Sequence, residues 1–166
     1  MPVEIERKFL VKPERLPSSG SHTTMSQGYI DSSGPVVRIR ITGENDCFLT
    51  IKGPTQGMSR SEFEYPIPID DGREILAKLC RQPLIEKTRH LIQHGSHVWE
   101  VDIFTGDNEG LIVAEVELDS EGESVELPSW VSIEVTQDPK YTNAALAQRP
   151  FSQWSAEEKS DGLTSV

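Results

Sequence analysis

The sequence contains only two cysteines, Cys47 and Cys80, which lie far apart and lack the spacing of metal ligands. We therefore expect two reduced thiols of a cytosolic protein rather than a disulfide framework. No apolar run approaches the roughly 20 residues that a membrane-spanning helix needs. The N-terminus also lacks the basic and apolar segments of a secretory signal. These absences predict a cytoplasmic protein without a membrane partner.

The chain also lacks a positive net charge. Its 27 Asp and Glu exceed its 16 Lys and Arg, which gives a formal net charge of −11 at pH 7. Nonspecific binding to nucleic acid or to an anionic membrane requires a basic surface, so we expect neither partner. A small anionic ligand is not excluded, since a few cations in a shielded cavity can bind one. No apolar stripe demands an oligomer, and a monomer or a homodimer would fit.

The length of 166 residues suits one domain. We place this domain at residues 1–149 and expect a polar, mobile tail over 150–166, in which Phe151 and Trp154 could still dock. Helices are predicted at about 70–81 and 140–148, and a short helix near 120–126 is compatible with the pattern.

Two-residue alternation of apolar and polar side chains dominates the rest of the chain. It predicts strands at about 3–11, 25–30, 36–42, 47–53, 61–68, 84–93, 97–105 and 111–118. Eight short strands joined by tight turns indicate a mainly β, α+β fold whose antiparallel sheet curls or closes into a barrel. Closure would also remove exposed sheet edges.

The polar face of these strands is almost entirely ionised. Its cations are Lys8, Arg38, Arg40, Lys52, Lys87 and Arg89, and its carboxylates are Glu4, Glu6, Glu62, Glu64, Glu100, Asp102, Glu115 and Glu117. A solvated outer face with weak cross-strand ion pairs is the simpler interpretation for any one pair. The joint pattern weakens it, because acid pairs and base pairs occupy separate strands.

If the sheet closes with this face inward, the chemistry is that of phosphoryl transfer. Carboxylates from different strands form an all-oxygen site for Mg²⁺ or Mn²⁺. Arginine and lysine suit a polyanion, and an arginine can bond two phosphate oxygens at once. Positioning and charge neutralisation carry most of the catalysis in such reactions.

The opening segment Val3-Glu4-Ile5-Glu6-Arg7-Lys8-Phe9 resembles the signature of the CYTH superfamily, also called triphosphate tunnel metalloenzymes. Further segments follow in that family's order: Arg38-Ile39-Arg40, Leu49-Thr50-Ile51-Lys52-Gly53, Glu62-Phe63-Glu64, Glu86-Lys87-Thr88-Arg89, Trp99-Glu100-Val101-Asp102, Ala114-Glu115-Val116-Glu117-Leu118 and, before the late helix, Glu134-Val135-Thr136-Gln137-Asp138-Pro139-Lys140-Tyr141 with Asn143. The resemblance reaches to about residue 148.

The resemblance implies an eight-stranded antiparallel tunnel with helices packed outside, a divalent metal and a triphosphate substrate. It implies metal binding by Glu4, Glu6, Glu115 and Glu117, with Asp102 as a helper. It implies phosphate binding by Lys8, Arg38, Arg40, Lys52, Lys87 and Arg89, with Lys140 near the tunnel mouth. Glu62 and Glu64 would hold a second metal, orient the cations or position the water, so the expected catalytic set is Glu4, Glu6, Lys8, Glu62 and Glu64.

We therefore expect a metal-dependent triphosphatase that cleaves inorganic tripolyphosphate to diphosphate and phosphate. Three alternatives stay open: a thiamine or nucleoside triphosphatase, a class IV adenylate cyclase that makes cyclic AMP, and a noncatalytic polyphosphate-binding module. The histidines His22, His90, His94 and His97 form no helical pair and are expected to be surface or structural residues.

Overall fold

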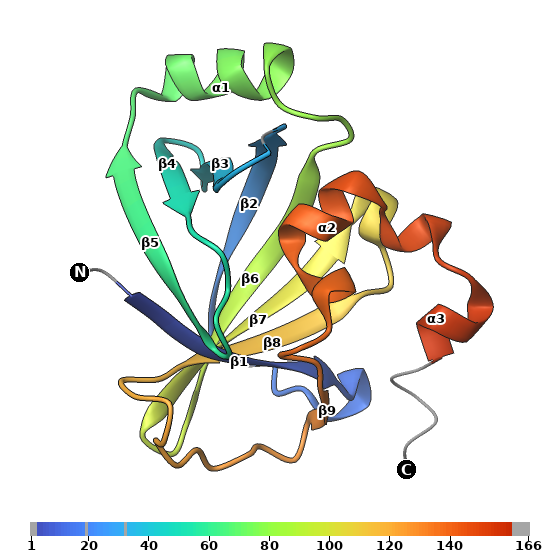
Figure 1. Ribbon diagram of the computed structural model, residues 1–166. Coiled ribbons are helices and arrows are strands. Elements are labelled where there is room, and N and C mark those ends of the chain that lie inside the picture. The colour runs from blue at the N-terminus through green and yellow to red at the C-terminus, as the bar shows by residue number, and fades with distance from the viewer. Residues whose placement is uncertain (1–2, 19, 32, 161–166) are drawn as a thin grey trace.

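The computed structural model describes residues 3–18, 20–31 and 33–160. Its strands are β1 (Val3–Val11), β2 (Ser21–Ile30), β3 (Val36–Thr42), β4 (Asp46–Lys52), β5 (Ser59–Pro66), β6 (Ile85–His94), β7 (His97–Thr105), β8 (Ile112–Glu117) and β9 (Val131–Glu134). They form an antiparallel sheet in the order β5-β4-β3-β2-β6-β7-β8-β1-β9 (Figure 1).

A further pairing between β5 and β1 closes this sheet into a barrel of eight strands, with β9 attached beside β1. The closing contact is short: Val3, Glu4 and Ile5 pair with Ser61, Arg60 and Ser59. The predicted eight-stranded antiparallel barrel is thus confirmed. Because side chains alternate along each strand, closure turns one complete set of alternating residues into the barrel interior.

The predicted strands all form, and the differences lie at their ends. β2 begins at Ser21, four residues before the expected start, where polar residues give no apolar alternation. Its first four residues pair with β6 alone, because β3 contacts β2 only from Met25 onward. The unpredicted strand β9 is four residues long and pairs with β1 at Phe9 and Val11.

Helix α1 (Ile69–Lys78) lies over β3 and β4 (Figure 1). Its Leu76 packs with Ile39, Cys47 and Cys80 on the outer side of the barrel. Gly72 allows this close approach, since a Cβ there would lie 2.1 Å from the Cys47 sulfur. Helices α2 (Asn143–Gln148) and α3 (Ala156–Ser160) follow near the C-terminus. Short 3-10 helices cover Pro13–Arg15, Gly106–Asn108, Pro139–Tyr141 and Phe151–Gln153.

The short helix expected near 120–126 does not form, and that interpretation was wrong. Side-chain contacts hold this segment in an irregular path instead. Glu121 accepts a hydrogen bond from Ser59 on β5, and Glu123 contacts His97 on β7. Across the described ranges, every helix is too short or too polar to cross a bilayer.

One apolar cluster on the outside of the barrel surrounds Trp99, which is fully buried. Its ring lies 5.5 Å from that of Phe9 and 5.6 Å from that of Trp130. The cluster covers the outer side of β1, β7 and β8.

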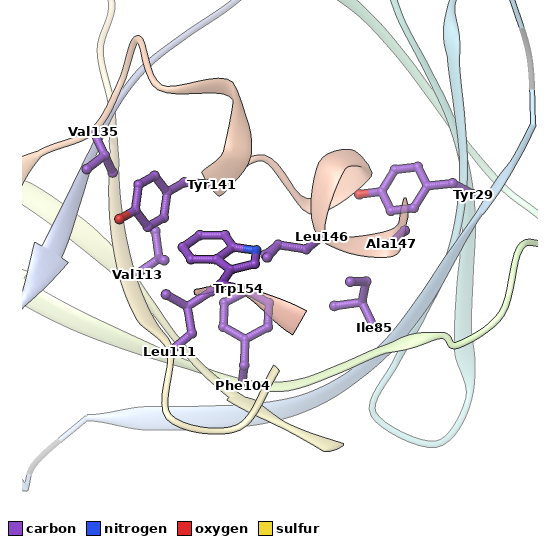
Figure 2. Packing of buried hydrophobic residues seen from close by; sticks show 10 residues of the cluster. All are labelled: Tyr29, Ile85, Phe104, Leu111, Val113, Val135, Tyr141, Leu146, Ala147 and Trp154. Atoms are coloured by element: carbon purple, nitrogen blue, oxygen red, sulfur yellow. The ribbon is translucent and has the colours of Figure 1, made fainter. Parts of the chain in front are cut away.

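A second apolar cluster joins the C-terminal segment to the barrel. Figure 2 shows Trp154 and Tyr141 lying among Phe104, Leu111 and Val113 of the barrel wall. The Trp154 ring lies 5.2 Å from that of Tyr141, and its indole N–H donates to the Arg149 carbonyl oxygen. The packed domain therefore extends past the predicted boundary at residue 149, at least to Trp154, because this aromatic side chain covers the barrel. Residues 161–166 of the predicted tail lie outside the described residues.

We predict that Trp154→Ala lowers the free energy of unfolding by about 3–5 kcal/mol, because it leaves a cavity where a large buried side chain was. Urea denaturation measures this change. The exposed Glu157→Ala serves as the control and should stay within about 0.5 kcal/mol of the parent protein. An unchanged midpoint for Trp154→Ala would mean that the C-terminal segment adds nothing to the stability of the barrel.

Candidate active site inside the barrel

The barrel encloses a cavity of about 590 Å³. Twelve of the 14 charged residues predicted for the inner face line it; the other two, Lys87 and Asp102, are buried and are not among the lining residues. The charged lining residues are Glu4, Glu6, Lys8, Arg38, Arg40, Lys52, Arg60, Glu62, Glu64, Arg89, Glu100, Glu115 and Glu117. Closure therefore gathers charges from seven strands around one space.

The charges are sorted across the barrel. Neighbouring strands β7, β8 and β1 contribute Glu100, Glu115, Glu117, Glu4 and Glu6, with Lys8 as the cation on this wall. On the other side, β3, β4 and β6 contribute Arg38, Arg40, Lys52 and Arg89. Strand β5, between β4 and β1, carries both signs as Arg60, Glu62 and Glu64. Strand β2 lies between the cationic strands and carries the uncharged Tyr29 into the lining. An anion and a cation could thus bind side by side on different walls.

The acidic wall contains two pairs of glutamates, and the members of each pair occupy directly opposed positions on neighbouring strands. Glu6 lies opposite Glu117 on β8, and Glu100 on β7 lies opposite Glu115. Like charges in directly opposed positions destabilise a sheet. Such pairs are tolerated where a proton or a cation neutralises them, so this wall has the chemistry of a cation site.

The proton affinities of these carboxyls reflect the same crowding. Burial, together with the charges of Glu115 and Glu4, raises the pKa of Glu6 to about 9. Burial opposes ionisation of Glu115 too, but Lys8 and a hydrogen bond with Glu6 hold the pKa of Glu115 well below its usual range. Without a metal, Glu6 therefore keeps a proton that it shares with ionised Glu115.

The acidic wall fits a hard divalent cation in donor chemistry, because it offers only carboxylate oxygens. In the described part of the chain, however, no three His, Cys, Asp or Glu side chains already surround a common point. Glu4 instead contacts Lys52 at 3.0 Å and Arg60 at 3.3 Å, and Glu115 lies 3.5 Å from Lys8. Binding a metal would require these carboxylates to turn away from their cations.

Asp102 belongs to a buried network and is not among the residues that line the cavity. Its two oxygens accept from Lys87 at 2.7 Å and from Arg89 at 2.8 and 2.9 Å. The Lys87 and Asp102 side chains are only 0% and 2% exposed. Asp102 does not reach the lining, and we therefore infer that it orients Lys87 and Arg89 rather than helping to hold metal as the resemblance implied.

The cationic wall has donors that the protein itself leaves available. The Nε atom of Arg38 is buried without a hydrogen-bond partner among the described residues. Arg40 is held by the Gln27 side-chain oxygen at 2.8 Å, and burial, with Arg38 and Arg89 nearby, lowers its pKa to about 10. Two adjacent guanidinium groups with unused donors suit the oxygens of a polyanion.

Residues 2–149 match the family model described as "CYTH domain". This chain belongs to the CYTH domain family. The match covers most of the chain, including all the charged residues that line the cavity.

The chain is also similar to two proteins named inorganic triphosphatase. The protein from Acetivibrio thermocellus is 43% identical over 152 residues, which are 89% of this chain and 95% of the relative. The protein from Nitrosomonas europaea is 34% identical over 149 residues, which are 87% of this chain and 96% of the relative. A crystal structure of an inorganic triphosphatase superposes with a TM-score of 0.65 at 32% identity, covering 89% of this chain and 95% of the other.

Sequence reasoning missed several residues of this CYTH site. Arg60 lines the cavity and contacts Glu4; its place two residues before Glu62 could have revealed it. Gln27 and Asn143 are uncharged, so charge alternation gave no signal for them. The Asn143 side-chain oxygen accepts from both Gln27 and Lys87 at 3.3 Å, and the Tyr141 carbonyl accepts from Lys8 at 3.2 Å.

Among the predicted substrate-binding residues, Lys140 neither lines the cavity nor belongs to the buried network of Lys87, Asp102 and Arg89. Its ammonium group lies over the rings of Tyr141, at 5.3 Å, and Trp154, at 5.2 Å. It is not among the residues that line the cavity. Its predicted role in substrate binding stays a prediction.

We predict that Asp102→Asn lowers the free energy of unfolding by about 3–5 kcal/mol, because it leaves the buried Lys87 ammonium without its counter-charge. The double variant Lys87→Met/Asp102→Asn should lose less than the sum of the single losses. Chemical denaturation of the four proteins gives this coupling. Glu64→Gln is the control: its pair with Arg38 involves a 42% exposed carboxylate and should cost under about 1 kcal/mol. Strictly additive losses would contradict a coupled buried pair.

The proton on Glu6 predicts a pH dependence of the metal-free protein. Since folding raises the pKa of Glu6 from 4.5 to about 9, the folded state holds a proton that the unfolded chain has lost. This contribution to stability is complete below pH 4.5 and declines as the pH rises towards 9. In chelator, Glu6→Gln should weaken this decline, measured as melting temperature at successive pH values. An unaltered slope would show that Glu6 ionises normally.

Proposed function

We propose that this chain hydrolyses inorganic tripolyphosphate to diphosphate and phosphate with Mg²⁺ or Mn²⁺. The observation that carries the proposal is the sorted cavity, in which arginines and lysines face a wall of like-charged carboxylates. The two similar proteins named inorganic triphosphatase support the same reaction.

The cationic wall binds the phosphates. Arg38 and Arg40 offer planar forks of N–H donors that match phosphate oxygens, and Lys52 adds a point charge from the next strand. Arg89 on β6 completes this wall, and Lys8 reaches the cavity from β1, so the chain of phosphates is held at several points. Gln27 fixes Arg40 and Asp102 fixes Arg89, so these guanidinium groups need little reorganisation on binding.

The acidic wall would hold the metal through Glu4, Glu6, Glu115 and Glu117. A divalent cation bound there neutralises charge on the phosphate oxygens and helps to align the substrate. Glu6 must give up its proton to become a ligand, so metal affinity should rise with pH.

Glu62 is the carboxylate that we assign to the attacking water. It lines the cavity, and burial raises its pKa, with Lys52 opposing and Glu4 adding to the effect. A raised pKa lets a carboxylate accept a proton from water as the oxygen attacks phosphorus. Glu64 is less suited, because Thr50 and Arg38 already donate to the same oxygen of it. We assign Glu64 to orienting Arg38.

The alternatives differ in products. The assay incubates the protein with tripolyphosphate, ATP or thiamine triphosphate in Mg²⁺, Mn²⁺ or chelator, and measures phosphate, diphosphate and cyclic AMP. Metal-dependent phosphate release fastest from tripolyphosphate supports the proposal. Cyclic AMP from ATP would instead identify a cyclase, faster release from an organic triphosphate would identify that substrate, and binding without turnover would identify a binding module. A cytosolic location and a monomeric or homodimeric state remain our expectations.

Neighbouring residues on β1 provide a matched test of the inner face. Lys8 lines the cavity, whereas Arg7 lies on the outer face, 2.7 Å from Glu134. Lys8→Ala should lower kcat/KM for tripolyphosphate by about 10²–10³-fold, the usual cost of removing a charge-stabilising donor. Arg7→Ala should leave kcat/KM within about threefold, because its ion pair is partly exposed. Equal losses in the two variants would contradict an interior active site.

A further inference from the structure

Two histidines outside the cavity face each other across β2 and β6. His22 lies directly opposite His90 in the register of these strands. Their rings are stacked, with centroids 5.4 Å apart and planes inclined by 30°. Arg89, the neighbour of His90, lines the cavity, so the alternation of a strand directs His90 to the outer surface.

These two imidazoles differ from the other histidines in their contacts. Within the described ranges, neither the His22 nor the His90 imidazole makes a hydrogen bond or an ion pair, and each ring has the other as its ring contact. In contrast, His97 is bonded to Glu123, and His94 lies 3.6 Å from Glu126. His22 is exposed and His90 half-buried, so solvent reaches the pair.

We propose that His22 and His90 form a surface chelate for a borderline divalent transition metal such as Zn²⁺, Ni²⁺ or Cu²⁺. Metal–nitrogen bonds of about 2.0–2.1 Å with a near-tetrahedral angle place two imidazole centroids roughly 5 Å apart. The observed 5.4 Å lies close to that separation. Small rotations of the side chains bring one nitrogen of each ring to a common point, and water completes the coordination.

This site and the cavity select different metals. Imidazole nitrogen favours zinc, nickel and copper, whereas the carboxylates of the cavity favour magnesium and manganese. The proposal does not rest on the proposed function, because the His22 and His90 rings lie outside the cavity lining. A metal there has a mechanical effect of its own. It links the first four residues of β2 more firmly to β6, because these residues pair with β6 and not with β3.

The probe is Ni²⁺ titrated into the full-length protein by calorimetry, in excess Mg²⁺ that competes for the carboxylates. We expect one saturable site with micromolar affinity, weakened by at least about tenfold in His22→Asn and in His90→Asn. His94→Asn is the matched control and should bind Ni²⁺ like the parent protein. Ni²⁺ should also raise the melting temperature of the parent protein but not that of His22→Asn.

A second measurement separates this site from binding elsewhere. In a Zn²⁺ titration followed by NMR, the ring signals of His22 and His90 should shift together before those of His94 and His97. Equal Ni²⁺ affinity in the parent protein, His22→Asn and His90→Asn would overturn the proposal, as would Zn²⁺ shifts spread evenly over all four rings. Phosphate release in Mg²⁺ should be the same in His22→Asn as in the parent protein, whatever the hydrolysis assay yields.

Discussion

The whole site depends on a very short contact, the three residue pairs that join β1 to β5. Without it the sheet would be open, and its charged face would be an ordinary wet surface with weak ion pairs. With it, Glu4 meets Arg60 directly across the seam and Lys52 from the next strand. The closing strands carry opposite charges at this point, so the seam is held by ion pairs as well as by backbone hydrogen bonds. The same residues then form part of the cavity.

Closure creates an electrostatic conflict that the protein resolves differently on its two walls. On the cationic side, Asp102 and Gln27 hold Arg89 and Arg40 in place. The acidic side keeps Glu6 opposite Glu117 and Glu100 opposite Glu115, and it settles part of the repulsion with a proton. A barrel selected for stability alone would bury apolar side chains at these positions. Lys8, Arg89 and the proton on Glu6 neutralise these pairs only in part. The remaining repulsion indicates a ligand, and the separation of signs indicates that the ligand includes both a metal and an anion.

Much of this arrangement could be predicted, because two-residue alternation is a local property. A charged face is predicted by the two-residue spacing of Arg38 and Arg40, and equally by that of Glu115 and Glu117. The missing parts depend on distant contacts. Strand β9 is four residues long and exists because β1 offers it an edge. Trp154 sits in a polar stretch, and only the apolar wall formed by Phe104, Leu111 and Val113 explains its burial. Gln27 and Asn143 carry no charge, so their role in the site becomes visible only when the barrel brings them together.

The contacts of Tyr141 and Asn143 join segments of the chain that are synthesised far apart in time. Lys8 leaves the ribosome 133 residues before its partner Tyr141. Asn143, which meets Gln27 and Lys87 inside the barrel, emerges at the same late stage. A nascent chain therefore holds its charged strands without the residues that complete the cavity until the segment around Asn143 has been synthesised. Such long-range contacts slow folding, and here they delay completion of the cavity until that segment has emerged.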